Sequence, residues 1–199
     1  MSKQVLIQPL PPTALGAYRI AAQTGLIAAT LAADSPLFSF RWGNLNNFAV
    51  VDYVDVSVII SAAITTAVPM GLDLVIARAF TTSDSGGTAI TPTGDMNKLK
   101  TNFDTTLVTD IRIATTGTLT AGTRTLDTDA IGQVIFGTGT TVATALAQTI
   151  LFDRATTSYP LVLARNEGFI IRNTLAGPAT GSFILSVDVG WIEMGKQVF

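Results

Sequence analysis

Two stretches of the sequence alternate between apolar and polar residues, and this alternation constrains the fold more than any other feature. In residues 48–60 and 181–193, apolar side chains recur at almost every second position. A period of two places them on one face of an extended strand, whereas a helix needs a period near 3.6. Both stretches are therefore predicted to be long, half-buried strands. The first apolar face reads Phe48, Val50, Asp52, Val54, Val56, Val58 and Ile60; the second reads Phe183, Leu185, Val187, Val189 and Trp191; the polar faces carry Asp55, Ser57, Ser182, Ser186 and Asp188.

The remainder of the chain has the composition of a β-protein. Threonine accounts for 30 residues, whereas there are only two glutamates and four lysines. Branched residues favour strands, and the scarce types are good surface-helix formers. We expect about eight to ten strands in an all-β, single-domain sandwich of jelly-roll-like topology. Residues 18–33 fit either a short helix or two strands, and we prefer strands. Further strands are predicted at residues 72–80, 110–114, 148–153, 161–164 and 169–174, and long Gly/Thr-rich loops at residues 81–102 and 137–144.

The N-terminal region differs from the body in its prolines. Residues 1–16 contain Pro9, Pro11 and Pro12. Proline restricts its own backbone and that of the preceding residue to largely extended conformations. We expect residues 1–16 to form an extended arm over the body or a neighbouring subunit, and residues 17–199 to form the sandwich domain.

The high apolar content does not indicate a membrane span. Hydrophobic residues make up 48% of the chain, and the mean hydropathy is +0.46. A spanning helix needs about 18 consecutive apolar residues, but the most apolar candidate, residues 56–70, is interrupted by serines, threonines and Pro69. The first residues lack the apolar core of a secretory signal. We expect a soluble protein, made in a cytoplasm, whose apolar surface is covered at a subunit interface.

The residue types that are missing exclude several kinds of chemistry. The chain contains no cysteine and no histidine. It therefore has no disulfide, no thiolate nucleophile and none of the usual zinc or iron–sulfur ligand sets. It also cannot build a Ser-His-Asp triad. The net charge of -2 and the pI near 4.9 argue against a nucleic-acid partner. We expect a protein that is not an enzyme and that binds no cofactor or metal.

Two short motifs resemble catalytic or phosphate-binding sequences. Residues 83–87 read Ser-Asp-Ser-Gly-Gly, like the nucleophile region of chymotrypsin-like proteases. The serine there needs an imidazole to take its proton, so we interpret the motif as a turn. A Ser-Lys dyad with Lys98 or Lys100 is the alternative. Residues 137–141 are rich in Gly and Thr but lack the lysine of a phosphate-binding loop.

Acidic residues offer two further interpretations. Asp127 and Asp129 form an Asp-x-Asp sequence, which fits a solvated turn or, alternatively, a structural calcium site. Asp52 interrupts an apolar strand face, and a buried carboxylate needs a partner. We predict that Asp52 forms an internal or intersubunit ion pair rather than a catalytic site. The arginines considered as its partner are Arg41, Arg78, Arg112 and Arg172.

Three aromatic residues share one face of a predicted strand. Alternation places Phe38, Phe40 and Trp42 together, opposite Ser39 and Arg41. Large aromatic side chains on one strand face usually belong to the core, because each buries a large apolar area. A sugar-binding platform is the alternative.

A series of short motifs runs in order along the chain, at residues 37–42 (LFSFRW), 77–81 (ARAFT), 86–88 (GGT), 97–99 (NKL), 110–114 (DIRIA), 119–123 (LTAGT) and 166–169 (NEGF). The series resembles small β-sandwich structural proteins in the virions of tailed bacteriophages, over roughly residues 15–195. The resemblance implies a sandwich that decorates or cements a capsid, commonly as a trimer. No catalytic residue can be transferred from it.

The leading hypothesis is therefore a capsid decoration or cement protein. It implies a homotrimer that binds the major capsid protein on the capsid surface of the virion, after synthesis in the cytoplasm of a bacterial host. No nucleic acid, membrane or small-molecule substrate is expected. The alternatives are a single jelly-roll capsid subunit, a tail or fibre-base component, or a sugar-binding adhesin using Trp42 or Trp191. The candidate interface or structural residues are Pro9, Pro11, Pro12, Arg41, Trp42, Asp52 and Arg78.

Overall fold

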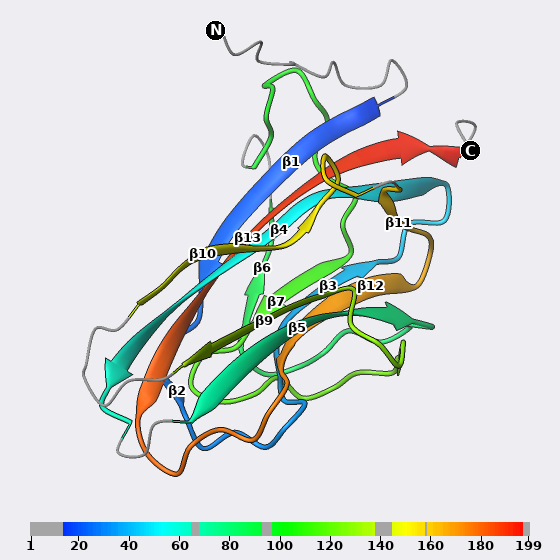
Figure 1. Cartoon of the computed structure of the whole chain (residues 1–199). Helices are drawn as coiled ribbons and strands as arrows, with labels where there is room; N and C mark the ends of the chain where they lie inside the picture. Colours follow the sequence, from blue (N-terminus) through cyan, green and yellow to red (C-terminus); the bar gives the residue numbers. More distant parts are fainter. Residues whose placement is uncertain (1–13, 65–67, 93–96, 138–144, 158, 197–199) are drawn as a thin grey trace, which may run out of the picture.

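The computed structural model shows two antiparallel β-sheets packed face to face (Figure 1). The prediction of an all-β sandwich is therefore confirmed. Among the residues that the structure describes, no helix is long and apolar enough to cross a membrane. The described residues are 14–64, 68–92, 97–137, 145–157 and 159–196.

The first sheet, sheet A, has the strand order β1-β13-β4-β10. Its centre is the pairing of β13 with β4, which continues along nearly the whole of both strands. These are the two alternating stretches of the sequence, so their prediction as long strands is confirmed. Two short strands complete the sheet, because β2 pairs with β13 and β11 pairs with β4. The bounds are β1 (Ala14–Gln23), β2 (Ile27–Ala28), β4 (Asn47–Ala62), β10 (Ala145–Asp153), β11 (Leu161–Leu163) and β13 (Ser182–Gly195).

The second sheet, sheet B, has the strand order β6-β7-β3-β12-β5-β8, and β9 also pairs with β5. Strand β12 is hydrogen-bonded to β3 on one side and to β5 on the other. Every residue of β5 between its two ends is buried, as expected for a strand covered on both faces. The bounds are β3 (Pro36–Trp42), β5 (Pro69–Arg78), β6 (Thr88–Ile90), β7 (Asp110–Ile113), β8 (Thr125–Leu126), β9 (Gly132–Gly137) and β12 (Glu167–Asn173).

Residues 18–33 form strands, which is the alternative preferred in the sequence analysis, rather than a short helix. Residues 18–33 contain most of β1 and all of β2, with no helix between them. Strand β1 already begins at Ala14, so the end of the predicted arm (residues 1–16) belongs to sheet A. The remainder of that arm lies outside the described residues, and so do its prolines Pro9, Pro11 and Pro12.

A β-bulge in β4 changes which side chains face the core. Gly190 pairs with Tyr53 and Trp191 pairs with Val51, so Asp52 is an extra residue in β4. A bulge of this kind reverses the alternation of side chains beyond it. The inference that Asp52 interrupts the apolar face is therefore wrong. Before the bulge, the odd-numbered residues Ala49 and Val51 join the main core, and after it the even-numbered residues Val54, Val56, Val58 and Ile60 do so.

Aromatic rings connect the two sheets through the core. The ring of Trp191 in β13 stacks on Tyr18 at 5.7 Å between centroids and meets Phe40 of β3 edge-on at 5.3 Å. Phe40 in turn stacks on Phe169 at 5.2 Å. Such ring pairs add to the free energy gained from burial alone. The side chain of Trp42 is 0% exposed, and its indole nitrogen donates to the carbonyl of Asn47 at 2.9 Å, so its prediction as a core residue is confirmed.

A second, smaller apolar cluster lies on the outer face of sheet A. It consists of Ala17, Val50, Ile192 and Met194, and the ring of Phe103 packs against it. Phe103 belongs to residues 97–109, which we call the strap. The strap is hydrogen-bonded to the edge of β1, where the Leu99 amide donates to the Ala17 carbonyl at 2.9 Å. The strap therefore covers one end of the outer face and leaves the middle open.

Candidate functional site

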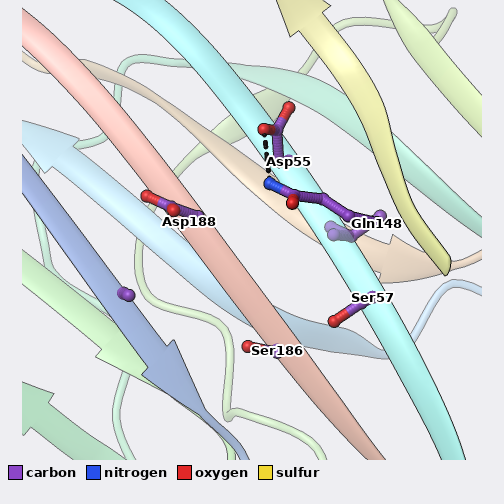
Figure 2. A pocket seen from close by; sticks show the side chains of 7 residues that line it. Asp55, Ser57, Gln148, Ser186 and Asp188 are labelled. Atoms are coloured by element: carbon purple, nitrogen blue, oxygen red, sulfur yellow. Dashed lines mark hydrogen bonds between the residues drawn. The ribbon is translucent and has the colours of Figure 1, made fainter.

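The outer face of sheet A carries a small hollow lined mainly by polar side chains (Figure 2). We call it the polar hollow. Its volume is about 160 Å³, the space of about five water molecules at liquid density. Its lining residues are Ala21, Asp55, Val56, Ser57, Gln148, Ser186 and Asp188.

Strand register brings the polar residues of the hollow together. Asp188 pairs with Asp55, and Ser186 pairs with Ser57, across β13 and β4. Figure 2 shows these four side chains projecting from two neighbouring strands, with Gln148 reaching in from β10. The register of β10 against β4 shifts between Leu146 and Thr149, the segment that contains Gln148. Such an irregularity can redirect a side chain, and here it accompanies the approach of Gln148 to Asp55.

Hydrogen bonds hold the side chains of the polar hollow in place. The Gln148 amide nitrogen donates to Oδ2 of Asp55 at 2.8 Å. Asp188 accepts from the Arg19 guanidinium, whose Nε lies 3.0 Å from Oδ1, and from the Tyr53 hydroxyl at 3.2 Å. Oδ1 of Asp55 is buried without a hydrogen-bond partner. Because only one of its two oxygens accepts a hydrogen bond, the Asp55 carboxylate is less well stabilised in its charged form than the Asp188 carboxylate.

The electrostatics follow from this arrangement. Burial raises the pKa of Asp55, and the neighbouring Asp188 raises it further, while the Gln148 hydrogen bond opposes both effects. The pKa of Arg19 is raised, chiefly by its hydrogen bond to Asp188. Burial is also the main reason why the pKa of Tyr53 is raised, followed by the charge of Asp188. Arg19 therefore balances the charge of Asp188, whereas the raised pKa of Asp55 makes the Asp55 carboxylate easier to protonate than an exposed aspartate.

A second hollow adjoins the first along β13, and we call it the apolar hollow. Its volume is about 280 Å³. Tyr53 forms its boundary with the polar hollow, because it lines the apolar hollow and bonds to Asp188. The glycine at position 190 allows the Tyr53 ring to lie directly against β13 at this boundary, since a Cβ there would collide with the ring. The lining residues are Ala17, Tyr18, Asp52, Tyr53, Leu99, Lys100, Arg154, Gly190, Trp191 and Ile192.

A buried carboxylate fastens the strap beside the apolar hollow. Glu193 is 1% exposed and accepts hydrogen bonds from the Leu107 amide at 2.9 Å and from the hydroxyl of Thr106. The Trp191 indole nitrogen donates to the same carboxylate at 3.2 Å. Burial raises the pKa of Glu193, and these hydrogen bonds counteract that rise. Sequence patterns do not single out Glu193, because the strap residues that bind it, Thr106 and Leu107, lie more than eighty residues away.

Asp52 forms an ion pair, but not with any of the arginines considered from the sequence. Its Oδ1 lies 2.7 Å from Nε of Arg154, and both side chains are partly exposed at the rim of the apolar hollow. The choice of Arg41, Arg78, Arg112 or Arg172 as partner is wrong. The reason is the bulge, which places Asp52 on the outer face of sheet A, whereas all four of these arginines belong to strands of sheet B.

The other predicted candidates have structural roles in sheet B. Arg41 donates to the carbonyls of Phe80 and Thr81, both at 2.7 Å, and so holds the loop that follows β5. Arg78 forms ion pairs with Asp127 at 3.2 Å and Glu167 at 2.6 Å. Neither arginine lines either hollow.

The Ser-Asp-Ser-Gly-Gly segment is a turn fixed by a buried charge. Gly86 and Gly87 have φ values of 74° and 58°, which favour glycine. Asp84 is 1% exposed, forms an ion pair with Arg124 and accepts from the Gly122 amide at 2.8 Å. Burial lowers the pKa of Arg124 to about 10. The turn interpretation agrees with this geometry, while the burial of Asp84 was not anticipated.

The alternative of a calcium site at Asp127 and Asp129 gains no support from the geometry. Both carboxylate oxygens of Asp127 accept from Arg78, at 3.3 and 3.2 Å. Within the described part of the chain, no group of three or more potential metal-ligating residues is found.

The outer face of sheet A thus combines an ordered set of hydrogen-bonding groups with an apolar hollow beside it. Such a combination can bind a ligand. No family model, no curated protein and no solved structure matches this chain significantly.

Proposed function

We propose that this protein is a non-enzymatic structural component of a bacteriophage virion, acting as a decoration or cement protein of the capsid. The observation that carries the proposal is the apolar surface along β9. Ile135 in β9 is 60% exposed, and Ile131, just before it, is 44% exposed. Contiguous exposed apolar patches mark sites of contact with other proteins, and we assign these two neighbouring isoleucines to such a patch.

The order of the strands supports a jelly roll, the topology expected from the strand and loop pattern of the sequence. Eight of the described strands have six or more residues: β1, β3, β4, β5, β9, β10, β12 and β13. We number these eight strands in chain order. Across sheet A, the order β1-β13-β4-β10 then becomes first, eighth, third and sixth. Across the main part of sheet B, the order β3-β12-β5-β9 becomes second, seventh, fourth and fifth. This interleaving is that of two Greek keys folded into a double-sheet jelly roll.

The composition of the chain also supports an assembly role. Only 13% of the residues are charged, about half the usual share of roughly 25%. A subunit interface with few charges loses little hydration energy when it forms. The proposed partners are further copies of this chain, as a homotrimer, and the major capsid protein.

The mass of the purified full-length protein, measured by light scattering, tests the proposal. A mass about three times the chain mass of 20.8 kDa is expected. Ile135→Asp is expected to shift the mass towards the monomer. The control Leu45→Asp changes an exposed leucine next to the start of β4 and is expected to leave the mass unchanged. A monomeric wild type would contradict the proposal, and closed shells would identify a capsid subunit instead.

The tryptophan-based sugar platform is not supported by the structure. Trp42 and Trp191 are 0% and 1% exposed, so neither ring is available for stacking. Any sugar-binding role would have to use other residues.

A further inference from the structure

We propose that the outer face of sheet A binds a neutral, extended oligosaccharide, with one sugar ring in the polar hollow and the next against the apolar hollow. This function is separate from assembly and uses a different face of the molecule from Ile135. It does not depend on either tryptophan ring being exposed.

The hydrogen-bonding groups of the polar hollow suit a ligand with several hydroxyls. Asp55, Asp188 and Gln148 present oxygen acceptors and an amide, and Ser57 and Ser186 present hydroxyls. Adjacent hydroxyls of a sugar donate and accept in the same way. The volume of about 160 Å³ is that of about five waters, which a ring with equivalent hydroxyls can replace without losing hydrogen bonds.

The side chains of the polar hollow are already ordered before any ligand arrives. Asp188 is held by Arg19 and Tyr53, and Gln148 is held by Asp55. Binding then costs little additional side-chain entropy. The two strand irregularities, in β10 near Gln148 and in β4 at Asp52, lie beside the polar and the apolar hollow respectively.

The charged groups around the two hollows are mostly paired with one another. Asp188 is paired with Arg19 beside the polar hollow, and Asp52 is paired with Arg154 beside the apolar hollow. A metal cation would find the carboxylate of Asp55 without a cationic partner, but within the described residues no group of three or more potential metal-ligating residues is found. An anion in the polar hollow would be repelled by that same carboxylate. Hydroxyl groups can be bound without displacing any of these pairs.

The two hollows together are long enough and apolar enough for more than one ring. Ser186, Asp188, Gly190 and Ile192 line the two hollows in turn along β13, and six residues of strand extend about 20 Å. Sugar rings also have apolar C–H faces, and apolar surface is available beside each of the two hollows. Ile150, which is 58% exposed, pairs with Asp55, and Leu99, which is 62% exposed, lines the apolar hollow.

The test is calorimetric titration of the full-length protein with maltotriose, cellotriose, chitotriose and mannotriose, each up to about 10 mM. At least one is expected to bind saturably. The double variant Ser57→Val/Ser186→Val fills the polar hollow with methyl groups and is expected to weaken binding about tenfold or more. Gln148→Ala, at an exposed position, should weaken binding in the same direction. The control Thr88→Val changes an exposed strand residue in sheet B and should have no effect.

Three outcomes would overturn the inference. The first is that none of the four trisaccharides binds. The second is equal binding by the wild type and both hollow variants, provided that circular dichroism shows all three to be folded. The third is saturable binding of spermidine or calcium chloride, but of no sugar, which would identify a cation site. None of these outcomes bears on the mass of the assembled protein, so the proposed structural role is tested separately.

Discussion

Asp55 and Asp188 lie directly opposite each other on the two central strands of sheet A, on its outer face. Only one of the two carboxylates has a cation as a partner, because Arg19 binds Asp188 whereas Asp55 depends on Gln148. Like charges placed opposite one another across two strands destabilise a sheet. The polar hollow is therefore a place where the fold is less stable than it could be.

Asp55→Asn is expected to stabilise the protein by about 0.5 kcal/mol at pH 7. The folded pKa of Asp55 lies above its ordinary value of 3.8, so the ionised group destabilises the fold at neutral pH. The loss of stability caused by the ionised Asp55 becomes smaller as the pH falls through its raised folded pKa. It is absent once the pH lies below the ordinary pKa of 3.8. The gain from the variant should thus be present at pH 7 and absent near pH 3. Urea unfolding at both pH values measures it, and a variant less stable than the wild type at pH 7 would contradict it.

Asp84→Ala is expected to destabilise the protein by about 3 kcal/mol, because it leaves Arg124 buried without its partner. The side chains of this pair are only 0% and 5% exposed. Replacing both with leucine should restore much of the loss, since the remaining charge is then removed as well. Asp127→Ala, in the exposed pair with Arg78, serves as the control and should cost less than about 1 kcal/mol. Equal losses in the two pairs would show that burial is not the cause.

Glu193→Ala should release the strap without unfolding the sandwich. The change removes the acceptor for the Leu107 amide and is expected to cost about 2 kcal/mol. Hydrogen exchange of the Leu107 amide should accelerate, while amides in the centre of β12 keep their protection. Unchanged exchange at Leu107 would mean that Glu193 does not hold the strap.

Trp42→Ala is expected to destabilise the fold by about 3–5 kcal/mol, as befits a fully buried ring. Trp42→Phe keeps most of the apolar volume and loses mainly the hydrogen bond to the Asn47 carbonyl, so it should cost clearly less. Thermal and urea unfolding of both variants measure the difference. A neutral Trp42→Ala variant would place the ring outside the core.

The sequence predicted the parts of the fold that depend on local pattern. Alternating residues identified β4 and β13, and the spacing of Phe38, Phe40 and Trp42 identified a core strand. These predictions succeeded because side-chain direction in a strand follows from its period of two. The prediction of which residues of β4 face the core was wrong around Asp52. Nothing in the local sequence indicates the bulge, which forms against Gly190 and Trp191 of β13.

The candidate site was less accessible to sequence reasoning. Asp55 and Asp188 were both recognised as polar-face residues, but their pairing depends on the register of two strands more than a hundred residues apart. Gln148 enters the site through a further irregularity in β10. Asp84 and Glu193 are buried by loops that reach them from elsewhere in the chain. In each case the partner is set by tertiary structure, which single-sequence patterns do not contain.

The bulge at Asp52 allows both apolar series of β4 to face the core. A regular strand with the same sequence would turn one part of β4 over relative to the other, so that either Ala49 and Val51 or Val54 and Val56 would point to solvent. Deleting Asp52 would instead leave Tyr53 alone between Val51 and Val54, and this restores strict alternation, so both apolar series would still face the core without a bulge. Position 52 is therefore expected to tolerate a single-residue deletion as well as substitutions that suit a partly exposed site.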